Sequence, residues 1–136
     1  MNELKSTRKD DWSDHLPATL RYDPSRWLGT WYNTLAETRH IGHLEILTQN
    51  GKLFMRVFGV CQPEPCDWGL AEMSLFNVGV DSYHTEGYLA KYDFGYCETQ
   101  LCGHEKQNVL VISSFTTFKD GSNRHNYYLR EFYYKK

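Results

Sequence analysis

The sequence lacks a surplus of positive charge. Its 15 Lys and Arg residues are balanced by 17 Asp and Glu residues, which gives a net charge of −2. Proteins that bind nucleic acid or an anionic membrane surface need clustered Lys and Arg to neutralise phosphates. We therefore expect neither nucleic acid nor a membrane as a partner.

The sequence also lacks long hydrophobic runs. Its first residues, MNELKSTRKDDWSD, are polar and charged, and no later segment has the length of a membrane span or of a signal peptide. This pattern predicts a cytoplasmic protein. Its 4 cysteines would then stay as free thiols in a reducing compartment. No motif points to a cofactor, so none is expected.

Helical periodicity is scarce, whereas aromatic residues are abundant, with 10 Tyr and 7 Phe. Aromatic and β-branched residues suit a half-buried sheet, so the composition favours an all-β fold. Residues 1–22 show no sustained period and are predicted to form a flexible N-terminal arm, followed by one β-barrel domain over residues 23–136. The segment Asp23-Pro24-Ser25 predicts a short helical turn at the start of this domain.

Turn signals divide the rest of the chain into strand-like segments. Asn50-Gly51 is a strong hairpin signal, and Asp120-Gly121 is another. The predicted strands are residues 30–36, 40–48, 52–60, 69–77, 83–92, 96–103, 108–118 and 124–134. No helical crossover separates them, and closing the meander removes its exposed edges. We therefore predict an eight-stranded antiparallel up-and-down β-barrel.

The start of the first strand carries a family resemblance. Gly29-Thr30-Trp31 resembles the Gly-x-Trp signature of the lipocalins and their calycin relatives. In that family a basic residue near the end of the barrel lies across the tryptophan, and Arg130 is the matching candidate. The resemblance implies a lipocalin-like barrel whose floor is closed by Trp31 beneath Arg130, a cation–π contact worth about 1 to 2 kcal/mol.

Strand counting places the turns at the two ends of this barrel. With Trp31 at the floor, the turns at 37–39, 61–67, 93–95 and 119–123 lie at the opposite end, which would be the mouth.

Three cysteines and a histidine fall near that end. Cys61, Cys66 and Cys97, with His40, are residue types that hold tetrahedral zinc. The Cys-x₄-Cys spacing and two intervening prolines instead favour a structural loop, closed by a 61–66 disulfide or carrying plain thiols. These residues are therefore only weak metal candidates, and no metal site is predicted.

Three polar residues alternate along the fifth predicted strand. His84, Glu86 and Tyr88 would point to one face, where they could transfer protons or hold a polar ligand. The alternative is a polar ladder that faces solvent.

An eight-stranded barrel has room for side chains or one small ligand, and the aromatic content favours an apolar or aromatic guest. The leading prediction is therefore a small-molecule binding protein. The expected ligand contacts are Trp31, Arg56, Phe58, Tyr88 and Tyr128. The alternative is an isomerase, dehydratase or cyclase that uses the trio above. A third reading is a homodimer formed through Tyr127 and Tyr133.

Overall fold

The structure is a computed structural model that describes residues 24–81 and 85–136. The predicted arm at 1–22 and the candidate His84 lie outside these described residues. A 3₁₀ turn, η3 (Pro24–Arg26), precedes one antiparallel sheet of nine strands. The strands are β1 (Gly29–Asn33), β2 (Ile41–Gln49), β3 (Lys52–Gly59), β4 (Cys66–Glu72), β5 (Ser74–Asn77), β6 (Thr85–Asp93), β7 (Cys97–Lys106), β8 (Val109–Phe118) and β9 (Tyr127–Lys135).

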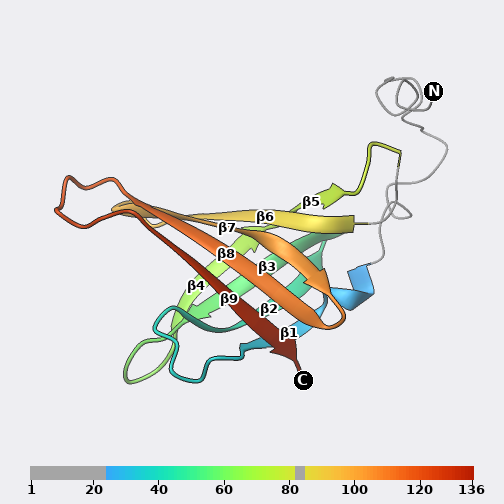
Figure 1. The fold of residues 1–136 in the computed structure, drawn as a ribbon, viewed down its shortest axis with the longest axis horizontal. Coiled ribbons are helices and arrows are strands. Elements are labelled where there is room, and N and C mark those ends of the chain that lie inside the picture. Colours follow the sequence, from blue (N-terminus) through green and yellow to red (C-terminus); the bar gives the residue numbers. More distant parts are fainter. Residues whose placement is uncertain (1–23, 82–84) are drawn as a thin grey trace.

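The sheet curls into a nearly closed barrel. Its order is β4-β3-β2-β1-β9-β8-β7-β6-β5, so the last strand pairs with the first, as the meander prediction requires. Figure 1 shows β6 to β9 lying across β1 to β4. No helix in the described ranges is both long and apolar enough to cross a bilayer.

The prediction of eight strands is wrong by one, because the segment predicted as a strand at 69–77 is divided at Met73. β4 pairs with β3 at one edge of the sheet, whereas β5 pairs with β6 at the other edge. Barrel strands are tilted, so a long strand that follows one neighbour at first leaves it later and reaches the other. Met73 is buried at this corner, and its N–H donates to the Leu53 carbonyl at 2.9 Å.

Side chains fill the barrel from its floor upward. Alternate residues on each strand point inward, as the two-residue period of a strand requires. The buried apolar set comprises Trp27, Trp31, Ile41, Leu44, Ile46, Leu53, Met55, Val57, Ala71, Met73, Tyr88, Ala90, Tyr92, Leu101, Leu110, Ile112 and Tyr133. This core fills much of the interior, so a ligand can lie only where these side chains leave a cavity.

The floor is closed by Trp31, but the cation above it is not Arg130. Lys135 Nζ lies 5.1 Å from the centroid of the Trp31 ring, and Lys135 is the cross-strand partner of Trp31. Arg130 instead lies over Phe132, at 5.1 Å, on the outer surface. Arg130 and Lys135 are five positions apart, an odd number, so the two side chains project from opposite faces of β9.

The glycine of the signature makes room for this lysine. Gly29 has a φ of +128°, and a Cβ there would lie 2.9 Å from Lys135 Cδ. The lysine ammonium also donates to the carbonyls of Arg26 and Leu28, at 3.2 and 3.1 Å. The floor is therefore a set of contacts between η3, β1 and the end of β9.

Candidate ligand-binding site

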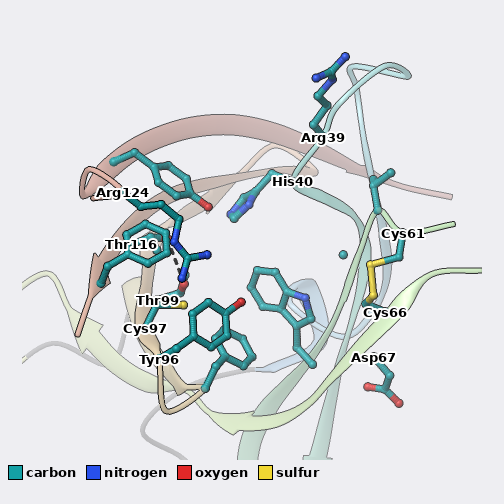
Figure 2. Close-up of a pocket in the computed structure, with 16 residues that line it drawn as sticks. Arg39, His40, Cys61, Cys66, Asp67, Tyr96, Cys97, Thr99, Thr116 and Arg124 are labelled. Atoms are coloured by element: carbon teal, nitrogen blue, oxygen red, sulfur yellow. Dashed lines mark hydrogen bonds between the residues drawn. A yellow bond between two sulfur atoms is a disulfide. The ribbon is translucent and has the colours of Figure 1, made fainter. Parts of the chain in front are cut away.

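A pocket of about 530 Å³ opens at the end of the barrel opposite Trp31; we call it the mouth pocket (Figure 2). Its size is typical of small-molecule sites. It lies where the turns after β1, β3 and β6 meet the ends of β8 and β9, which is the end predicted as the mouth. Its lining residues are Arg39, His40, Gly59, Val60, Cys61, Cys66, Asp67, Trp68, Phe94, Tyr96, Cys97, Thr99, Thr116, Phe118, Arg124 and Tyr127.

Aromatic rings pack against one another along one wall. The Trp68 ring lies edge-on to His40, Tyr92 and Phe94, at centroid distances of 5.5, 5.4 and 5.3 Å. Tyr92 is fixed from below, because its hydroxyl donates to the carbonyls of Met55 and Gly69 at 3.1 and 2.8 Å. Edge-to-face packing of this kind favours one arrangement of the rings. The wall is therefore formed before any ligand arrives.

Local backbone geometry places Trp68 in this wall. The register of β3 with β4 shifts between Phe58 and Arg56, so Trp68 and Gly69 together face the single residue Val57. This is a β-bulge, which bends a strand and redirects its side chains. A Cβ at Gly59 would lie 2.7 Å from Trp68 Nε1, so only glycine leaves the indole its position.

His40 reaches into the mouth pocket from the start of β2. Its Nε2 lies 3.2 Å from Ser114 Oγ. Burial lowers the pKa of His40 below its ordinary value of 6.5, and nearby Glu131 partly opposes that shift. His40 is therefore neutral at neutral pH, and its ring can donate or accept a hydrogen bond.

The opposite side of the pocket, formed by β7 and β8, carries hydroxyl groups. Thr99 and Thr116 are cross-strand partners, each buried, and their hydroxyl oxygens are 3.0 Å apart. The buried Cys97 lines the pocket beside them. This side is therefore more polar than the side that holds Trp68.

Arg124 is the charged group that enters the pocket. Figure 2 shows its guanidinium directed inward, whereas Arg39 and Asp67 point away. The guanidinium lies over the rings of Phe118 and Tyr96, at 4.5 and 5.2 Å. Asp67 is instead bound by Arg56 on the outer surface.

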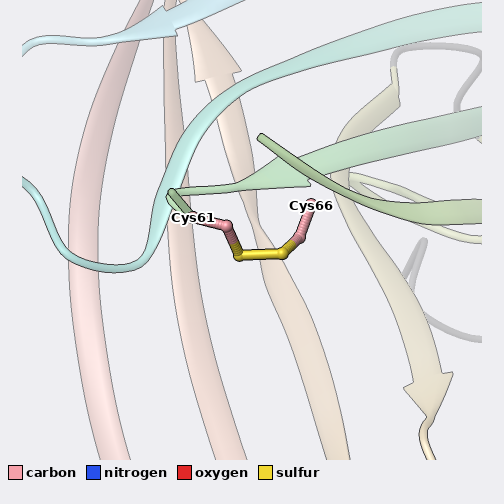
Figure 3. The surroundings of a disulfide bond; sticks show 2 residues. All are labelled: Cys61 and Cys66. Atoms are coloured by element: carbon pink, nitrogen blue, oxygen red, sulfur yellow. A yellow bond between two sulfur atoms is a disulfide. The ribbon is translucent and has the colours of Figure 1, made fainter. Parts of the chain in front are cut away.

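A disulfide joins Cys61 and Cys66 at the pocket wall (Figure 3). The thiol prediction is therefore wrong for this pair. The weak zinc set of Cys61, Cys66, Cys97 and His40 is corrected as well, because sulfurs bonded to each other are not thiolate ligands. Disulfides are rare in a reducing cytoplasm, so this bond does not support the cytoplasmic prediction.

The residues predicted as ligand contacts do not line the mouth pocket. Trp31 lies at the floor, and Tyr88 is buried in the core. The other three lie on the outer face: Arg56 pairs with Asp67, Phe58 stacks on His43, and Tyr128 packs against Phe115. Each of the three belongs to the strand phase opposite the buried residues.

The described residues do not test the acid–base trio as a set. His84 lies outside the described residues, and the pairing of β5 with β6 shifts register at Glu86. The Tyr88 hydroxyl donates to the Val111 carbonyl at 3.0 Å, and burial raises its pKa well above the ordinary value of 10.0. The Tyr88 hydroxyl therefore has a structural role in the core, and the catalytic role of the trio stays a prediction.

The two tyrosines predicted to form a dimer interface lie in the core and at the mouth pocket. Tyr133 is 1% exposed, and its hydroxyl donates to the Ile41 carbonyl at 3.1 Å. This burial contradicts its expected exposure. Tyr127 is exposed, but it lines the mouth pocket.

Sequence reasoning missed Trp68, Phe94 and Arg124, and it assigned Tyr127 to a dimer rather than to the pocket. A signal was present for the first three, because each lies in or beside a turn assigned to the mouth. Candidates were instead chosen from the strands, where sequence alternation does not reveal which face is inside.

Comparisons with known proteins were made for the whole chain. A scan against protein-family models, a search of curated proteins and a search of solved structures each returned no match. The described residues form an antiparallel, nearly closed β-barrel, which is compatible with a lipocalin-like fold. Membership of the calycin group stays a prediction that rests on Gly29-Thr30-Trp31.

Proposed function

We propose that this protein binds a small, flat, largely apolar molecule in the mouth pocket. The observation that carries the proposal is the aromatic wall around Trp68, whose rings are fixed by their neighbours and face a pocket of about 530 Å³. A preformed aromatic surface favours binding because little conformational freedom is lost when the ligand arrives.

The rest of the barrel supports the same location. Its core below the pocket is filled by side chains, so a guest rests near the mouth rather than deep in the interior. Hydrogen-bonding groups lie at defined points of the lining, among them His40 and the hydroxyls of Thr99 and Thr116. An apolar wall with a few polar anchors is the usual composition of a small-molecule site.

Calorimetric titration with three neutral aromatic compounds, 2-naphthamide, coumarin and flavone, tests this proposal. We expect at least one of these compounds to bind. The Tyr127→Ser substitution should weaken that binding about fivefold, because one aromatic ring that lines the mouth pocket is lost. Tyr128→Ser is the matched control: Tyr128 is the next residue, is also exposed, and lies on the outer face. Its affinity should equal that of the wild type.

Two results would overturn the proposal. One is an absence of binding to a folded protein both by all three compounds and by the corresponding acid, 2-naphthoate. The other is an equal loss in the Tyr127 and Tyr128 variants, which would place the site elsewhere. The enzymatic alternative is not proposed, because the Tyr88 hydroxyl lies in the core and is occupied by a backbone carbonyl.

A further inference from the structure

We infer that the ligand of the mouth pocket is an aromatic acid, whose anionic group is bound by the Arg124 guanidinium while its ring packs against Trp68. This inference rests on the proposed function and specifies the class of ligand.

The Arg124 guanidinium is held in place from outside the pocket. Its Nη2 donates to Asp120 Oδ2 at 2.7 Å, and its Nε donates to Ser122 Oγ at 3.2 Å. Two rings, Phe118 and Tyr96, support its face. Among the described residues, no acceptor is recorded for Nη1. The guanidinium is therefore positioned, and one terminal nitrogen stays available to a ligand that enters from the pocket.

No carboxylate competes for this cation inside the pocket. The charged lining residues in the described ranges are Arg39, Asp67 and Arg124. Asp67 points away from the pocket and accepts hydrogen bonds from Arg56 and from the Gly69 N–H. An anionic group that reaches Arg124 therefore meets a cation and no acid within the cavity.

The hydroxyl pair adds a donor on the same side of the pocket. Thr99 and Thr116 hold two hydroxyl protons, and the bond between their oxygens uses one. The other proton can be donated to an oxygen of a ligand. The side opposite is apolar, with Val60, Trp68 and the disulfide. The pocket thus has an apolar wall facing a wall of donors, which matches a flat molecule with oxygens at one edge.

Asp120 limits the strength of this site. Its carboxylate already neutralises part of the Arg124 charge from outside, so the preference for an anion is smaller than at an isolated guanidinium. Replacing Asp120 with Asn keeps an acceptor for Arg124 and removes the competing charge. This substitution should therefore strengthen binding of an anion and leave binding of a neutral compound unchanged.

The test compares 2-naphthoate with 2-naphthamide, which have the same ring and nearly the same shape. We expect the wild type to bind the acid about tenfold more tightly than the amide, because hydrogen bonds to a charged partner are the stronger ones. Arg124→Gln should abolish this preference and keep amide binding. Arg130→Gln removes a positive charge on the outer face and should keep the preference. Asp120→Asn should increase it.

The outcomes separate this inference from the proposed function. If neither compound binds, and coumarin and flavone do not bind, both fail. If the amide and the acid bind equally to the wild type, the inference fails and the proposed function stands. The inference also fails if the preference survives in Arg124→Gln, or if Arg39→Gln is the variant that removes it. Thermal unfolding of each variant verifies that it is folded.

Discussion

Lys135 and Arg130 show how one residue position decides a role. Both are basic, both lie on β9, and either could have been the cation that covers Trp31. The ladder between β1 and β9 puts Lys135 directly beside Trp31, and the alternation of the strand turns Arg130 to the outer face. The charge is the same for both residues. Register alone distinguishes them.

Replacing Lys135 with Met should lower the free energy of unfolding by about 1 to 3 kcal/mol, because a cation–π contact and two hydrogen bonds to the carbonyls of Arg26 and Leu28 are lost. Arg130→Met should change it by less than about 0.5 kcal/mol, as is usual for an exposed site. Urea unfolding measures both values. A larger loss in the Arg130 variant would restore the family-based assignment.

At the scale of elements, the segment from the end of β3 into β4 builds the pocket wall. The disulfide closes the turn, the bulge redirects Trp68, and Gly59 leaves space for the indole. The disulfide, the β-bulge and Gly59 all lie within about a dozen residues of the chain. The side that carries Thr99 and Thr116 needs no such device, because it follows from the regular pairing of β7 with β8.

Removing the disulfide should loosen this wall. The bond links cysteines with a sequence separation of 5, and the loop-entropy relation then predicts a loss of about 2 kcal/mol in the Cys61→Ser, Cys66→Ser double variant. Affinity for an aromatic ligand should fall as well, because both residues line the mouth pocket. Urea unfolding and calorimetry measure the two effects.

Cys102 supplies the control for that experiment. It is a free cysteine on β7 and does not line the mouth pocket. Cys102→Ser should leave ligand affinity unchanged. If the double variant keeps wild-type stability and affinity, the disulfide has no part in forming the wall.

At the scale of the whole molecule, the barrel has a seam. β4 and β5 are the two edges of the sheet, although they follow each other in sequence with only Met73 between them. β7 and β8 each have a neighbour on both sides and form long ladders. The barrel is therefore expected to open first at β4 and β5 and last at β7 and β8.

Hydrogen exchange monitored by mass spectrometry or NMR tests this order. Amides of β5, the shortest edge strand, should exchange fastest among the strands, and those of β7 and β8 slowest. The physical reason is that an edge strand is paired along one side only and gains less from its neighbours. Protection in β5 equal to that in β8 would show a seam that is fully closed.

The sequence by itself determined the strand-rich architecture, the hairpin turns, the pairing of first with last strand and the end at which those turns gather. These features are local: Asn50-Gly51 turns the chain wherever it lies, and a meander with no crossover has few other arrangements. The position of Trp31 at the floor was also predicted from the sequence, through the Gly29-Thr30-Trp31 signature.

Only the tertiary structure decided which side chains face inward, which cation covers Trp31, where the long fourth segment breaks, and which residues line the mouth pocket. The physical reason is that the side-chain period of a strand is two, so both faces of a mixed polar and aromatic strand look alike in sequence. Bulges such as the one at Trp68 and Gly69 then change the phase within a strand. Contacts between segments distant in sequence, such as that of Trp68 with His40, join residues that no local pattern connects.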